Sequence, residues 1–178
     1  FSQIYAKSAP SQSEAGYAMG LGFSPQIFTA LLMYSAVSLA ISITISGKCI
    51  DKIGRRIWLI WTTVAVAIFG LALPYFLENG TTVSLFWFLI IGMGLIGMGY
   101  GPLSSFLPEL FPTHVRYTGA SLTYNIAGLF GASVAAIIAL PLNANYGLKG
   151  VGIYLTLNAV LSLIGLWFIT ETRDRQLL

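Results

Sequence analysis

The sequence predicts an all-α, multi-pass membrane protein, and three observations lead to this fold class. The 178 residues are 56% hydrophobic and only 8% charged, with a mean hydropathy of +0.80, whereas a soluble domain carries about a quarter charged residues. Five apolar runs are each long enough to cross a bilayer as a helix. The charged residues lie between these runs and not within them.

The five predicted membrane spans follow one another along most of the chain. They are expected at residues 26–46, 57–77, 83–105, 118–140 and 151–170. Ser24 and Pro25 suit the N-cap and first turn of the first helix. Trp58 and Trp167, each near one end of a span, suit the aromatic belts of a membrane protein. External loops are expected at residues 8–24 and 143–150.

Basic residues are distributed unevenly over the connecting segments. Two of the nine, Lys7 and Lys149, fall in segments predicted to lie outside. The other seven fall in segments predicted to lie inside, namely Lys48, Lys52, Arg55, Arg56, Arg116, Arg173 and Arg175. The positive-inside rule therefore predicts a cytoplasmic C-terminus. The clusters form no basic stripe with interleaved aromatics, so binding to nucleic acid is not expected.

Metal-dependent and nucleophilic enzyme chemistry finds no support in the sequence. Cys49 is the single cysteine and His114 the single histidine, so neither has a cluster of metal ligands around it. We expect Cys49 to fill space in a turn and His114 to lie in a loop at the membrane surface, with a proton relay as the alternative for His114. No cofactor, metal or catalytic residue is expected.

A charged turn between the first two spans carries the most specific motif. Its spacing, Gly-x-x-x-Asp-Lys-x-Gly-Arg-Arg, is formed by Gly47, Asp51, Lys52, Gly54, Arg55 and Arg56. The glycines would let the backbone reverse, and Asp51 would favour the positive end of the following helix dipole. The positive-inside rule alone explains the charges but not this spacing. The turn resembles the signature loop of the major facilitator superfamily, found between the second and third helices of each six-helix half.

A second motif lies between the third and fourth spans, at residues 108–119. It reads Pro-Glu-Leu-Phe-Pro-Thr-x-x-Arg-Tyr-Thr-Gly, with Glu109 and Arg116 as its charged members. This segment resembles the loop between the tenth and eleventh helices of sugar porters. Its residue sequence resembles that of the metabolite:proton symporter family more closely. A loop bounded by prolines, with one surface ion pair, is the alternative interpretation.

The resemblance implies a partial major facilitator fold, with spans equivalent to helices 8–12 of twelve. It implies proton-coupled symport of a small metabolite, such as an organic acid, a betaine-like or a sugar-like solute, by alternating access in the plasma membrane. The two charged loops would form cytoplasmic gates. The partner would be a missing six-helix N-terminal half, and the chain, which begins at Phe1, is expected to be a piece of a longer polypeptide. The alternative is a truncated, non-transporting membrane protein or a pseudogene fragment.

Polar residues inside the spans are the candidates for a substrate path. They are Tyr34, Tyr100, Tyr124 and Asn125. Each could instead be a packing residue. Residues 92–102 are rich in glycine, which favours either close helix packing or a bendable helix that flexes at Gly101 and Pro102. Since no span carries a charged residue, a proton-carrying carboxylate is not expected in this chain.

Overall fold

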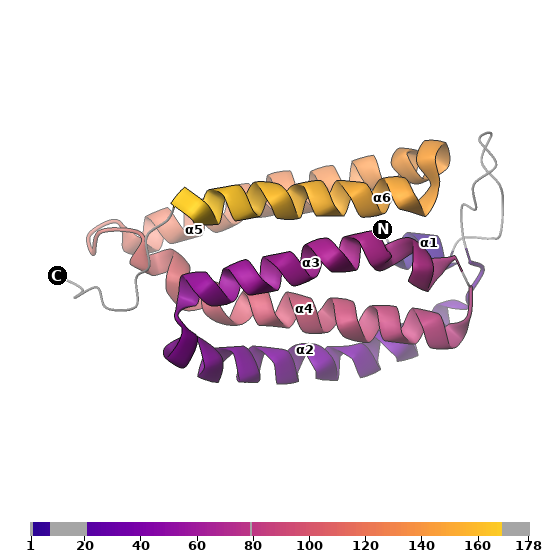
Figure 1. Cartoon of the computed structure of the whole chain (residues 1–178), viewed down its shortest axis with the longest axis horizontal. Helices are drawn as coiled ribbons and strands as arrows, with labels where there is room; N and C mark the ends of the chain where they lie inside the picture. The colour runs from indigo at the N-terminus through magenta and orange to yellow at the C-terminus, as the bar shows by residue number, and fades with distance from the viewer. Residues whose placement is uncertain (1, 8–20, 79, 169–178) are drawn as a thin grey trace.

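The computed structural model is all-helical over the residues that it describes, which are 2–7, 21–78 and 80–168. Long helices lie side by side along one axis (Figure 1). The elements are α1 (Ser2–Lys7), α2 (Pro25–Ile53), α3 (Arg55–Leu77), α4 (Thr82–Glu109), α5 (Arg116–Ala127), the π-helix η1 (Gly128–Ser133) and α6 (Val134–Phe168). The predicted all-α fold class is confirmed.

Within the part of the chain that the structure describes, four helical segments are long and apolar enough to cross a membrane. They are Pro25–Ile50, Arg55–Leu77, Thr82–Glu109 and Ile137–Phe168. The last of these contains Gly147 with φ 64° and ψ −169°, and the chain reverses there (Figure 1). The span expected at 118–140 is divided among α5, η1 and the beginning of α6. The predicted span at residues 118–140, and therefore the predicted total of five membrane spans, stays a prediction.

Two of the helix starts follow from capping side chains. The Ser24 hydroxyl accepts a hydrogen bond from the Ile27 amide at 3.3 Å, and Pro25 occupies the first helical position of α2. The Thr81 hydroxyl caps α4 in the same way, with the Ser84 amide at 3.2 Å. Each cap satisfies one of the amide groups that a helix leaves unpaired at its N-terminus.

The chain reverses in fewer residues than the sequence indicated, which corrects two expectations. Residues 47–53 belong to α2, so Gly47 is helical, and Gly54 alone, at φ 100°, separates α2 from α3. The expected external loop at 143–150 is helical on both sides of Gly147, and Asn143 there is only 1% exposed. Both reversals use a glycine with positive φ, a conformation that other residues adopt at a steric cost.

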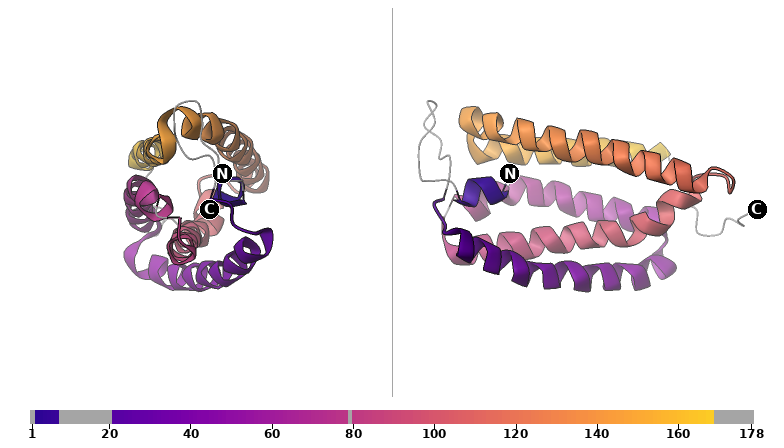
Figure 2. Two further views of the ribbon diagram at one scale, coloured as in Figure 1. Left: turned by 90° about the vertical axis from the view of Figure 1, so that its right-hand side faces the viewer. Right: turned by 180° about the vertical axis from the view of Figure 1, so that it is seen from behind.

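Seen along the helices, α2, α3 and α4 lie on one side and α5 and α6 on the other (Figure 2). α2 and α4 approach closely through small residues. Ser42 and Ser46 are buried on α2 and face Gly97 and Gly101 on α4. A Cβ atom at Gly97 would lie 2.6 Å from the Leu39 carbonyl oxygen. The glycine-rich stretch therefore packs closely here, as one of its two interpretations predicted.

Three serines of α2 have hydrogen-bonded hydroxyl groups. Ser35 donates to the Leu32 carbonyl at 2.8 Å and Ser46 to the Ile43 carbonyl at 3.0 Å, both on their own helix. Ser38 instead donates across to the Ile90 carbonyl of α4 at 3.0 Å. These three hydroxyl groups therefore add no cost of buried, unpaired polar groups to the packing of α2.

Replacing Gly97 by alanine should destabilise the protein, whereas the same change at Gly99 should not. A Cβ at Gly99 meets nothing within 4 Å, so Gly99→Ala gains the helix propensity of alanine, about 1 kcal/mol. Gly97→Ala gains the same term but forces α2 and α4 apart, at a cost of about 1–3 kcal/mol. The midpoints of thermal unfolding in detergent measure the difference. Equal midpoints for the two variants would contradict the close contact at Gly97.

Candidate functional site

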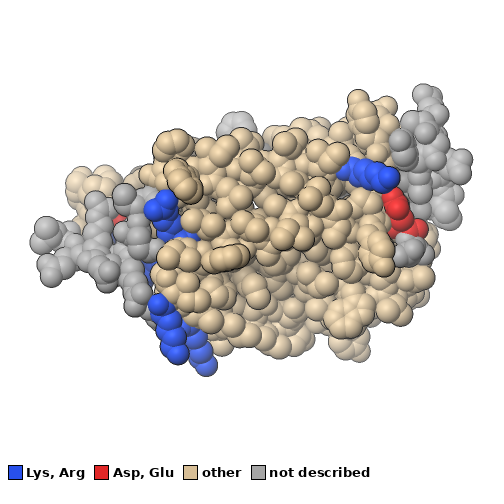
Figure 3. All heavy atoms as spheres, viewed as in Figure 1, with Lys and Arg blue, Asp and Glu red and all other residues tan. Residues whose placement is uncertain are grey.

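The charged motif of residues 47–56 spans the joint between α2 and α3. Lys48 and Lys52 are exposed at the end of α2. The backbone of Asp51 lies in the last turn of α2, while its side chain is outside the part that the structure describes. Asp51 therefore belongs to α2, which continues to Ile53, and the expected effect of its carboxylate on the dipole of α3 stays a prediction. Basic atoms gather at this end of the molecule (Figure 3).

Arg55 of the first motif forms an ion pair with Glu109 of the second. Arg55 is the first residue of α3 and Glu109 the last residue of α4, with side chains 22% and 16% exposed. Each charge is unfavourable at its own helix end, because helix N-termini repel cations and C-termini repel anions. Pairing offsets both effects and joins the ends of α3 and α4.

Arg56 joins the same end of the bundle to a third helix. Its Nε donates to the Leu166 carbonyl at 3.0 Å and its Nη2 to the Trp167 carbonyl at 2.8 Å. Both carbonyls belong to the last turn of α6, where a helix leaves carbonyl groups unpaired and attracts cations. Adjacent arginines therefore connect the start of α3 with the ends of α4 and α6.

Arg116 is not the partner of Glu109 in the described part of the chain. It is the first residue of α5, and its Nε atom is buried without a hydrogen bond to any described residue. Among the described residues, the single ion pair within residues 108–119 that the alternative interpretation expects does not form. Glu109 pairs instead with the neighbouring charged motif.

Two of the four substrate-path candidates lie in one cavity. Tyr100 on α4 and Tyr124 on α5 line a cavity of about 340 Å3 together with Thr123 and Gly128. Tyr34 lines a different cavity with Phe86 and residues near the start of α4.

Asn125, the fourth candidate, is exposed on α5, as is its neighbour Tyr124. The Asn125 amide group donates to the Ser121 carbonyl of its own helix at 2.8 Å. Asn125 is not among the described residues that line the Tyr100–Tyr124 cavity.

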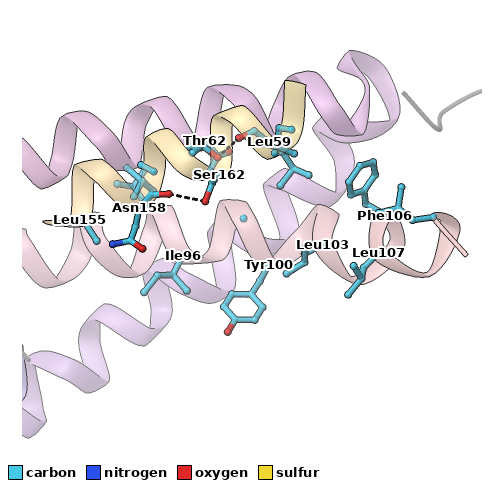
Figure 4. Close-up of a pocket in the computed structure, with 18 residues that line it drawn as sticks. Leu59, Thr62, Ile96, Tyr100, Leu103, Phe106, Leu107, Leu155, Asn158 and Ser162 are labelled. Carbon is cyan, nitrogen blue, oxygen red and sulfur yellow. Dashed lines mark hydrogen bonds between the residues drawn. The ribbon is translucent and has the colours of Figure 1, made fainter. Parts of the chain in front are cut away.

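A larger cavity of about 650 Å3, not foreseen from the sequence, lies between α3, α4 and α6. Its polar lining consists of Thr62, Thr63, Tyr100, Asn158 and Ser162. Figure 4 shows Ser162 bonded to Asn158, while the Tyr100 ring points away from both. Asn158 and Ser162 are four residues apart in an apolar run and therefore lie on the same face of a helix. This spacing could have identified them from the sequence.

The described linings of the Tyr100–Tyr124 cavity and of the larger cavity are polar in places but uncharged. Among the described residues, no charged side chain lines either one. Within the same residues, no cluster of His, Cys, Asp and Glu could bind a metal. The polar groups available are phenols, hydroxyls and amides, which can form hydrogen bonds and, in the phenols, offer aromatic faces.

Helices of this length and apolarity, with weakly polar cavities between them, define a multi-pass membrane protein. Residues 16–178 match the profile of the family described as "Sugar (and other) transporter". The chain belongs to that family, and its relatives are proteins of solute transport.

Three relatives illustrate the similarity. A protein of Haemophilus influenzae described as a candidate metabolite transport protein is 88% identical over 99% of this chain. The inner membrane metabolite transport protein YhjE of Escherichia coli is 41% identical over 93% of the chain. The proline/betaine transporter of Salmonella typhimurium is 30% identical over 90%. The chain spans 40%, 38% and 34% of these relatives, respectively. No solved structure matches the chain.

Replacing Arg56 by glutamine should loosen the last turn of α6. The change removes the charge and shortens the reach to the Leu166 and Trp167 carbonyls, which should cost on the order of 1 kcal/mol. Hydrogen exchange of the amides at residues 160–168 should become severalfold faster. Lys48→Gln, at an exposed lysine of the same motif, is the control and should leave this exchange unchanged. Similar exchange in the Arg56→Gln variant and the unaltered chain would count against the capping role.

Proposed function

We propose that this chain is the C-terminal part of a proton-coupled symporter for a small metabolite. The family match over residues 16–178 carries the proposal, and the names of several relatives refer to metabolites or betaines. The solute would be an organic acid, a betaine-like or a sugar-like compound. The relatives are more than twice as long as this chain, which supports a missing N-terminal half as the partner in alternating access.

The proton would be carried by a residue outside this chain. The predicted spans contain no Asp, Glu, Lys, Arg or His, and intramembrane proton relays use such residues. We place the protein in the plasma membrane with its C-terminus in the cytoplasm, because basic residues are concentrated in the segments on that side.

The two charged motifs would act together as part of a cytoplasmic gate. Arg55 and Arg56 hold the joint between α2 and α3 against the ends of α4 and α6. The joint would thereby present Asp51, with Lys52 beside it, to the missing half, while Arg116 would serve the same gate from the start of α5. Making and breaking such contacts would favour one of two transporter conformations over the other.

Asp51→Asn should change the balance between the two conformations in a complete transporter. This protein would be made by joining the chain to the remaining part of its Haemophilus influenzae relative, with any cysteines of that part replaced. Cys49, two residues before Asp51, would report the accessibility of the inner face through its rate of labelling by a maleimide. We expect the rate and the KM for transport each to change severalfold. Lys48→Gln is the control, and unchanged values for Asp51→Asn would argue against the gate.

The solute would contact Tyr100 and Tyr124, and the other candidates, Asn125 and Tyr34, would lie farther along its path. The shared cavity of the two tyrosines supports this order. Tyrosine offers both an aromatic face for a cation and a hydroxyl for hydrogen bonds, so the pair could hold a zwitterion without a charged side chain.

Uptake of labelled solutes tests the function. Vesicles containing the joined protein would be given organic acids, betaines and sugars, with and without an inward proton gradient. Gradient-driven uptake by the joined protein supports the symporter. Uptake without any response to the gradient would refute proton coupling, and the absence of uptake across the whole panel would favour a non-transporting membrane protein.

Tyr100→Leu and Tyr124→Leu should each raise the KM for the transported solute by about tenfold, equivalent to about 1.4 kcal/mol of lost binding. Tyr→Phe changes at the same positions retain the aromatic face and show whether the hydroxyl is needed. Tyr34→Leu, in a separate cavity, is the matched control and should change the KM less. Equal effects at all three positions would contradict a contact site at the Tyr100–Tyr124 cavity.

A further inference from the structure

A groove of about 430 Å3 lies between α3 and α6, away from both charged motifs. Its floor is the place where these helices touch. A Cβ atom at Gly152 would lie only 2.4 Å from the Gly70 carbonyl oxygen, and the Thr156 hydroxyl donates across to the Ala67 carbonyl at 3.1 Å. Because the two backbones approach this closely, the described side chains leave a groove beside the contact.

The walls of the groove are apolar and accessible from the side of the bundle. Leu71 on α3 and Ile153 on α6 are 62% and 54% exposed, and both line it. Pro74 completes the wall. Helices of this kind face lipid in a membrane, so this groove is placed to receive a hydrocarbon chain.

Two opposite charges and a phenol stand at the mouth of the groove. Glu78 directly follows α3, whose apolar run ends at Leu77, and Lys149 projects from α6. Tyr75, 77% exposed, lies beside them. A span that ends here puts these groups at the depth of the lipid headgroups, where tyrosines are enriched. Figure 3 shows acidic and basic atoms near each other on this face, at the end of the molecule away from the charged motifs.

Glu78 and Lys149 line the same groove without pairing with each other. Both are exposed, and in the described part of the chain no ion pair joins them. A ligand that carries a positive and a negative group can therefore reach both charges. Its apolar part would lie against Leu71 and Ile153.

We propose that this groove binds a phospholipid whose headgroup contains both a phosphate and a primary amine, as in phosphatidylethanolamine. The Lys149 ammonium contacts the phosphate, and the lipid ammonium donates hydrogen bonds to the Glu78 carboxylate. Phosphatidylcholine is disfavoured because its trimethylammonium group has no N–H to donate. An anionic lipid such as phosphatidylglycerol is disfavoured because Glu78 repels it. The proposal does not depend on the transported solute.

Native mass spectrometry of the purified full chain, with each of these three lipids added in turn, tests the proposal. Phosphatidylethanolamine should bind about tenfold more tightly than the other two, which corresponds to about 1.4 kcal/mol. Lys149→Gln should weaken binding of phosphatidylethanolamine severalfold. Glu78→Gln should weaken it as well, and should at the same time tighten binding of phosphatidylglycerol.

Lys7→Gln is the matched control, because Lys7 lies over the Phe28 ring and does not line the groove. It should leave all three affinities unchanged. Equal binding of phosphatidylethanolamine and phosphatidylcholine would overturn the proposal. Tighter binding of phosphatidylglycerol to the unaltered chain would also overturn it, as would equal losses in Lys7→Gln and Lys149→Gln. Circular dichroism of each variant should show unchanged helix content, because Glu78 and Lys149 are exposed and Lys7 is half-buried.

Discussion

Close approach of helix backbones is the constraint on which the bundle depends. A bilayer supplies no water to the backbone, so each helix must satisfy its own amide and carbonyl groups. Association between helices then relies on packing and on a few hydrogen bonds. The chain meets this requirement at the Gly97 contact of α2 with α4 and at the Gly70–Gly152 contact of α3 with α6. Ser38 and Thr156 add hydrogen bonds across these two interfaces.

At the end of the bundle that carries the two charged motifs, ion pairs and charge–dipole interactions connect the helices. Glu109 would be unfavourable at the C-terminus of α4 on its own, and Arg55 at the N-terminus of α3, so their pairing makes both positions tolerable. Arg56 uses the favourable end of a different dipole, at the last turn of α6. The first charged motif therefore has a structural role that is independent of gating, because it connects the start of α3 with the ends of α4 and α6.

The fold class was predictable because apolar length and charge spacing are local properties. The start of α2 followed from Ser24 and Pro25 for the same reason. The single-residue joint at Gly54 was not predictable, since local sequence does not fix the residue at which a helix ends. Nor was the pairing of Glu109, because Arg116 is nearer in sequence but Arg55 is nearer in space.

The candidate site was foreseen in part. Polarity within apolar runs identified Tyr100 and Tyr124, and the structure places both at one cavity. The same criterion selected Asn125, whose amide group bonds its own helix, and passed over Asn158 and Ser162, which line the larger cavity. Polarity reveals that a residue needs a partner, but the partner depends on which helices become neighbours.

The joint at Gly54 has a mechanical consequence. A flexible loop between two helices would absorb a displacement of either one, but a single residue has almost no slack. An axial movement of α2 by one residue, about 1.5 Å, would be transmitted directly to Arg55 and Arg56. These two side chains connect to the ends of α4 and α6. A displacement of α2 along its axis would therefore reach α3 directly and, through Arg55 and Arg56, the ends of α4 and α6.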